Sequence, residues 1–162
     1  MTRIFFALLI AQSLTMGATT MAAQDSTYDS QALRAAGVLG VVEVYRGSGD
    51  NLVGRVGSSL RGLDLAKLVK SSPNAVVEAE KFHRNYVKGA IGLSAAIVSL
   101  SLANGLRTIP DLNQAIHQTP WAFGALCLVF GVRSMATAYS ALSKSIWWYN
   151  RDLAESLTSR VQ

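Results

Sequence analysis

The stretch "GAIGLSAAIVSLSLANGL", residues 89–106, decides the fold, because it holds 18 uncharged residues between Lys88 and Arg107. An apolar run of this length is at the lower limit for a transmembrane helix. The helical pattern begins earlier, since Pro73 suits a first helical position and the chain has no further proline until Pro110. The charged residues 74–88 and the uncharged residues 89–106 therefore belong to one long predicted helix.

A second long helix is predicted from Trp121, where "WAFGALCLVFGVRSMATAYSALSKSIWWYN" begins, to about Leu157. The segment before it, "TIPDLNQAIHQTP", contains two prolines and is interpreted as the connecting loop. We predict a mainly α fold whose chief element is an antiparallel helical hairpin over residues 73–158. Its transmembrane segments are expected at about 87–106 and 121–142.

Small residues recur on both predicted helices at intervals of three and four, which places each set on one helical face. Lipid offers no hydrophobic drive for helix association, so membrane helices pack through small residues that let backbones approach closely. The predicted packing residues are Gly89, Gly92, Ala96, Ser99 and Ala103 in the first helix and Gly124, Cys127, Gly131, Ser134 and Ala138 in the second.

The two small-residue faces share a common register. In a hairpin folded about residue 113 or 114, the numbers of facing residues add to about 227, so Gly89 faces Ala138 and Ala96 faces Gly131. We therefore predict that the two faces pack on each other. The alternative is that they face other subunits, since small-residue faces also form dimers.

The N-terminus, "MTRIFFALLIAQSLTMGATTMAAQDS", has one basic residue, a short apolar run and small residues up to Ala23. This layout predicts a secretory signal peptide over residues 1–23, with an uncleaved anchor as the alternative. The polar and small residues 24–39 predict a flexible leader. Residues 40–72 follow as a small module, with a β-hairpin at about 40–56 around the turn "GSGDN" and a short amphipathic helix from Leu63.

Arg133 is a charge inside the second predicted transmembrane segment, twelve residues after Trp121. A charge deep in a membrane costs about 2.5–3.5 kcal/mol and by default marks a functional site. The alternatives are a snorkelling side chain and a contact with a lipid head group or another subunit. Aromatic residues near the ends of the two segments are interpreted as membrane-interface anchors, namely Tyr86, Trp121, Trp147, Trp148 and Tyr149.

The predicted orientation contains a conflict. A signal peptide exports residues 24–87 and the C-terminus, yet these flanks hold most lysines and arginines, and the loop holds only Arg107. The positive-inside rule favours the reverse orientation. We retain the export signal and expect a bacterial envelope membrane protein with its N-terminal module on the periplasmic side.

The composition narrows the function classes. The net charge of +5 over 162 residues is spread thinly, which does not support nucleic-acid binding. The single cysteine excludes an intramolecular disulfide, and Glu80-x-x-His83 is one isolated half of a helical metal motif. Since phosphate-binding and nucleophile motifs are also missing from the sequence, we expect no enzyme activity, no cofactor and no metal.

From Leu60 to Leu153 the chain resembles a class of small bacterial envelope proteins. The resemblance rests on the short amphipathic helix, "SSPNAVVEAEKFHRNYVKG", the Gly/Ala-rich apolar helix and "SIWWYNRDL" with its Tyr-Asn near the end of the second helix. It implies a two-helix membrane protein and brings no activity with it.

Three functions remain open at this point. The first is a non-enzymatic anchor or scaffold that inserts its hairpin in the bilayer and binds a second copy or another membrane protein. The second is a membrane protein that binds lipid or another anionic small molecule through Arg133. The third is a soluble secreted helical hairpin.

Overall fold

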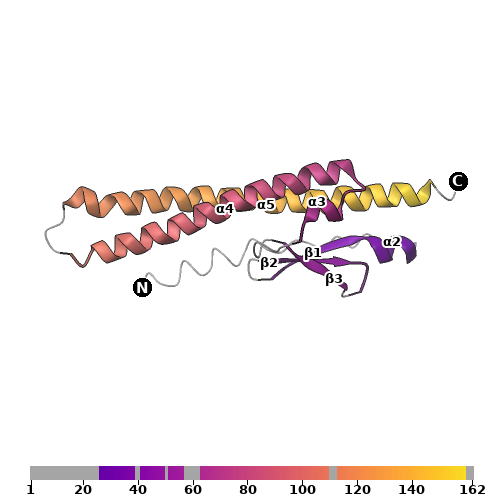
Figure 1. Ribbon diagram of the computed structural model, residues 1–162, viewed down its shortest axis with the longest axis horizontal. Coiled ribbons are helices and arrows are strands. Elements are labelled where there is room, and N and C mark those ends of the chain that lie inside the picture. Colours follow the sequence, from indigo (N-terminus) through magenta and orange to yellow (C-terminus); the bar gives the residue numbers. More distant parts are fainter. Residues whose placement is uncertain (1–25, 39–40, 50, 57–62, 110–112, 160–162) are drawn as a thin grey trace, which may run out of the picture. The chain divides into compact units, whose positions relative to one another are not determined.

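The computed structural model describes residues 26–38, 41–49, 51–56, 63–109 and 113–159 (Figure 1). The predicted signal peptide lies outside the described residues. The chain divides into two compact units, Met1–Gly62 and Leu63–Gln162. The first contains a small sheet and the second contains the long helices, so the predicted mainly α fold with a helical hairpin is confirmed.

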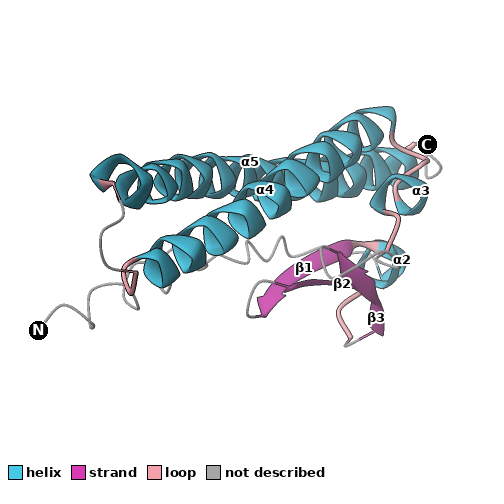
Figure 2. Ribbon diagram, turned by 60° about the vertical axis from the view of Figure 1, so that its left-hand side comes forward, coloured by secondary structure: helices cyan, strands magenta, loops and turns pink. Residues whose placement is uncertain are grey.

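The first unit is a three-stranded antiparallel sheet preceded by a short helix (Figure 2). Helix α2 (Ser26–Gln31) leads to β1 (Leu33–Val38), β2 (Val41–Arg46) and β3 (Asn51–Val56), in the order β1-β2-β3. The predicted hairpin corresponds to β2 and β3. Gly47 has a φ of +80° in the turn after β2, a left-handed conformation that glycine adopts without strain.

The predicted flexible leader is wrong for the residues that form α2 and β1. Leu33 of β1 is buried and pairs with Arg46 of β2, while Val44 and Val56 are buried from the neighbouring strands. An isolated two-stranded hairpin is marginal in water, so a third strand supplies needed burial. The sequence of β1, "LRAAGV", contains residues of low strand propensity, and its structure therefore depends on pairing with β2.

The second unit begins with the short helix α3 (Leu65–Leu68), which confirms the short helix predicted from Leu63. The Asp64 side chain caps it by accepting a hydrogen bond of 3.3 Å from the Lys67 backbone N–H. Leu65 and Val69 are buried, and α3 contacts the long helix α4 (Pro73–Leu106). The antiparallel partner of α4 is α5 (Gln114–Thr158), and the two helices form the hairpin (Figures 1 and 2).

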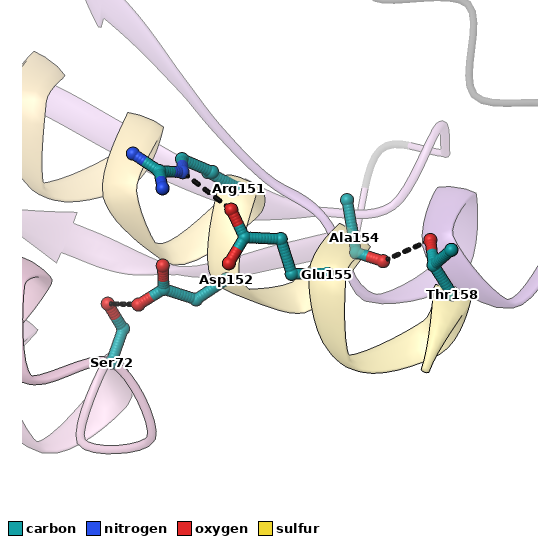
Figure 3. Close-up of polar contacts among 6 residues, drawn as sticks. All are labelled: Ser72, Arg151, Asp152, Ala154, Glu155 and Thr158. Atoms are coloured by element: carbon teal, nitrogen blue, oxygen red, sulfur yellow. Dashed lines mark hydrogen bonds and ion pairs between the residues drawn. The ribbon is translucent and has the colours of Figure 1, made fainter. Parts of the chain in front are cut away.

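Two serine hydroxyls connect the start of α4 to the C-terminal part of α5 through hydrogen bonds. Ser72 caps α4 by accepting a hydrogen bond from the Ala75 N–H, and its hydroxyl donates to an Asp152 carboxylate oxygen at 2.5 Å (Figure 3). The Ser145 hydroxyl donates to the Ala75 carbonyl at 2.8 Å. Both serines are buried, so these bonds satisfy polar groups that water does not reach.

Helix α5 begins about two turns earlier than predicted, because Pro120 lies inside the helix rather than ending the loop. A proline removes one helical hydrogen bond, and this cost usually confines it to the first turn. Here the Pro120 carbonyl accepts a hydrogen bond of 2.7 Å from the Ser99 hydroxyl of α4. This contact joins residues far apart in the chain, so the local sequence pattern did not reveal it.

Candidate functional site

The predicted small residues lie together where α4 and α5 pack. All five on α4 are buried, and on α5 all are buried except Cys127, which is partly buried. The same face continues beyond the predicted set through Ala141 and Ser145. The two small-residue faces therefore pack on each other within one chain.

The register of this packing differs by one helical turn from the prediction. A Cβ placed on Gly92 would lie 3.0 Å from the Gly131 Cα, and one placed on Gly124 would meet the Leu100 side chain at 2.9 Å. These facing numbers add to 223 and 224 (92 plus 131, and 124 plus 100) rather than 227. The predicted pairing of Ala96 with Gly131 is therefore wrong. Small residues repeat at about one per turn on both helices, so a slip of one turn again places small residues opposite each other.

The observed register also changes the position of Arg133 along the hairpin. Arg133 now lies at the level of residue 90, about 3 Å along the axis from Lys88. The uncharged helical segments bounded by these cations are Gly89–Leu106, about 27 Å long, and Gln114–Val132, about 28 Å long. Arg133 is consequently at the end of the uncharged segment rather than near its centre. The sequence already shows that no charged residue lies between Asp111 and Arg133. The prediction placed Arg133 well inside the apolar segment because it took Trp121 as the first residue of the helix.

We call residues 89–109 and 114–132 the apolar half of the hairpin, and residues 73–88 and 133–158 the charged half. Nearly all large apolar side chains that the described part of the second unit exposes belong to the apolar half or adjoin it: Val87, Ile91, Ile97, Val98, Leu102, Ile109, Ile116, Trp121, Phe123, Leu126, Val129, Phe130 and Val132. Val77 and Trp147 are the exceptions among those described residues. The apolar half therefore presents an apolar surface on its outside as well as small residues inside.

Both long helices are long and apolar enough to cross a membrane, by length and composition. Their best 18-residue windows have mean hydropathies of 1.6 and 1.4, and 28% of each window is buried within the protein. A core helix of a water-soluble protein is mostly buried, whereas a lipid-facing helix is not. The low burial thus favours contact with a further apolar phase, as weak support for membrane association.

The predicted interface anchors fall into two groups. At the loop end, the Arg107 guanidinium carbon lies 4.7 Å from the centre of the Trp121 ring, a cation–π contact. At the other end of the apolar half, Tyr86 contacts Phe82, with ring centres 5.6 Å apart. Trp121 therefore lies within the apolar half, toward its loop end, and Tyr86 lies in the charged half, three residues before the apolar half begins on α4.

The second group lies within the charged half. Trp147 and Trp148 form an edge-to-face pair with ring centres 4.7 Å apart, and Tyr149 follows them. Trp147 is about 21 Å beyond Arg133 along α5. The Arg151 guanidinium lies 4.9 Å from the Trp148 ring centre and donates a hydrogen bond to Glu155 at 2.7 Å (Figure 3). This group therefore lies far from the apolar half and forms an aromatic and ionic cluster on α5.

Among the described residues, no group of three or more His, Cys, Asp or Glu side chains is placed to hold a metal ion. Comparison of the chain with known protein-family models, curated proteins and solved structures finds no match. The outer surface of the hairpin is the candidate functional site.

Proposed function

We propose that the chain is a bacterial envelope membrane protein that acts as a non-enzymatic anchor or scaffold. The apolar half of the hairpin inserts in the bilayer, and the loop between α4 and α5 reaches the opposite surface. The charged half stays outside the hydrocarbon, together with the N-terminal unit that precedes it in the chain. A second copy or another membrane protein is the proposed partner of these exposed parts.

The observation that carries this proposal is the distribution of exposed apolar side chains. Leu126 is 70% exposed and Ile97 is 67% exposed, both in the apolar half. Large contiguous apolar surfaces are rare on soluble monomers and mark membrane or partner contacts. The uncharged segments, about 27 and 28 Å long, are close to the roughly 30 Å of a bilayer hydrocarbon core.

A matched pair of variants separates the membrane hairpin from a soluble hairpin. Leu126→Arg places a charge on the apolar half, and Val77→Arg places the same charge on an equally accessible site of the charged half, since Val77 is 61% exposed. We expect Leu126→Arg to lower membrane insertion by about 2.5–3.5 kcal/mol, a loss of more than fiftyfold, and Val77→Arg to leave it unchanged. The readout is the fraction of protein that resists carbonate extraction from membranes. Equal behaviour of the two variants, or full extraction of the unchanged protein, would contradict insertion.

Cysteine labelling tests the orientation. In a Cys127→Ala background, single cysteines are placed at Ser71 before α4, at Gln114 after the loop and at Ser159 after α5, all exposed positions. An impermeant maleimide should label Ser71→Cys and Ser159→Cys from one side and Gln114→Cys from the other. We propose that the first two face the periplasm, as the signal-like N-terminus favours. If these two cysteines are labelled only after lysis, the orientation is the reverse of the proposed one and agrees with the positive-inside rule. The membrane hairpin itself would still be supported.

A further inference from the structure

We infer that the hairpin binds one anionic phospholipid, with the acyl chain in a groove beside α4 and the phosphate on the cations at its end. This inference rests on the proposed membrane insertion and names a specific lipid contact of the inserted hairpin. Three features carry it: the groove, the alignment of cations with it, and the absence of an ion pair between these cations and any described carboxylate.

The groove is an open cavity of about 680 Å³ in the apolar half. Its lining includes Ile91, Ala95, Val98 and Leu102 of α4 and Phe123 of α5. From Ile91 to Leu102 it extends about 16 Å along the helix axis, a length that suits an extended acyl chain. The groove is open along one side rather than enclosed, and most of its lining is apolar.

The cations continue the two helical faces that line the groove. On α4, residues 84, 88, 91, 95, 98 and 102 are spaced by four and three, so Arg84 and Lys88 share one face with the groove residues. On α5, residues 123, 126, 130 and 133 are spaced by three and four, so Arg133 shares a face with Phe123. Lys88 and Arg133 lie at nearly the same level, and both faces end in a cation there.

These cations form no ion pair within the part of the chain that the structure describes. Arg84, Lys88 and Arg133 are exposed, and among the described residues no carboxylate lies within ion-pair distance of them. The sequence has no acidic residue on α4 after Glu80 and none on α5 before Asp152. Three cations at the edge of an apolar surface are complementary to a phosphate at the depth of lipid head groups, and arginine suits phosphate oxygens in particular.

The test compares lipid retention by the full chain, extracted in mild detergent and analysed by native mass spectrometry. Phosphatidylglycerol supplies the anionic lipid, and phosphatidylcholine with the same acyl chains supplies the zwitterionic control. We expect one phosphatidylglycerol per chain to be retained in preference to phosphatidylcholine. The variant Lys88→Gln/Arg133→Gln should lose this preference by about 25-fold, since each basic residue near an anionic surface contributes roughly fivefold.

Two further variants make the result specific. Arg107→Gln removes a cation at the loop end of the apolar half and should retain lipid as the unchanged protein does. Ala95→Trp fills the groove and should lower retention of both lipids while leaving every cation in place. Excess inorganic phosphate should not compete, because the free anion lacks the acyl chain.

Equal retention of the two lipids, equal loss in Arg107→Gln and the double variant, or displacement by inorganic phosphate would each overturn the lipid site. The carbonate assay on the same preparations keeps the two proposals separate. Full extraction of the unchanged protein would overturn both, whereas resistance to extraction without lipid preference would overturn only the lipid site.

Discussion

Replacing Gly131 by alanine tests the close packing of the hairpin directly. A Cβ at this position would lie 2.8 Å from the Leu93 backbone nitrogen and 3.1 Å from the Gly92 carbonyl carbon. Both neighbours are backbone atoms, which cannot move aside as a flexible side chain can. The helices must therefore separate locally, which loosens the packing of the small residues on either side.

The expected magnitude follows from two opposing effects. Overpacking a well-packed contact costs about 1–3 kcal/mol. Alanine in a helix interior is about 1 kcal/mol more favourable than glycine. Gly131→Ala should consequently range from neutral to about 2 kcal/mol less stable than the unchanged protein. Gly105→Ala is the matched control, because a Cβ there meets nothing within 4 Å and only the favourable effect remains.

The assay is unfolding of the two variants in mixed micelles with increasing dodecyl sulfate, followed by helical circular dichroism. The quantity to compare is the difference in unfolding free energy between Gly131→Ala and Gly105→Ala, expected to be about 1–3 kcal/mol. An equal gain in stability for both glycine variants would show that α4 and α5 do not approach each other closely at Gly131.

Three further predictions address other parts of the molecule. In the observed register Ala96→Cys should form an intramolecular disulfide with Cys127 faster than Ser99→Cys does, as judged by mobility on non-reducing gels. The opposite order would support the predicted register, in which the numbers of facing residues add to 227. Ser72→Ala removes a helix cap and a buried hydrogen bond and should cost about 1–2 kcal/mol, seen as faster amide exchange at the start of α4, whereas unchanged exchange would show that the cap is dispensable. Hydrogen bonds from Tyr45 and then Arg55 hold the pKa of Glu43 below its ordinary value of 4.5, so its contribution to the sheet is present above that pH and lost as the pH falls through the lowered pKa. Glu43→Gln should remove this dependence from the exchange of β2 and β3 amides; a pH profile identical to that of the unchanged chain would argue against the interaction.

Some features of the proposed lipid site can be predicted from the sequence, and others require the structure. The spacing of Arg84, Lys88 and the apolar residues after them can be read directly from the sequence, because helical periodicity fixes which residues share a face. The partnership of Lys88 with Arg133 cannot be read in this way. It depends on the register of α4 against α5, and the small-residue pattern also fitted a register one helical turn away.

In the sheet, too, some strands could be predicted from local sequence and one could not. The β2–β3 hairpin was visible as an alternating run around a glycine-rich turn, which are local signals. Strand β1 has two alanines and a glycine and depends on its pairing with β2, so its local sequence resembled a leader.

Local sequence patterns predicted two long helices and the small-residue face of each, although the apolar stretch of α5 was expected at 121–142 and lies at 114–132. These properties follow from composition and a period of about 3.6 residues, and both are local. The tertiary structure was needed to establish the register, and with it the level of Arg133 beside residue 90 of α4. A face of small residues repeats every turn and accepts several registers almost equally, so the choice among them depends on contacts between distant residues, such as Ser99 with Pro120 and Ser72 with Asp152.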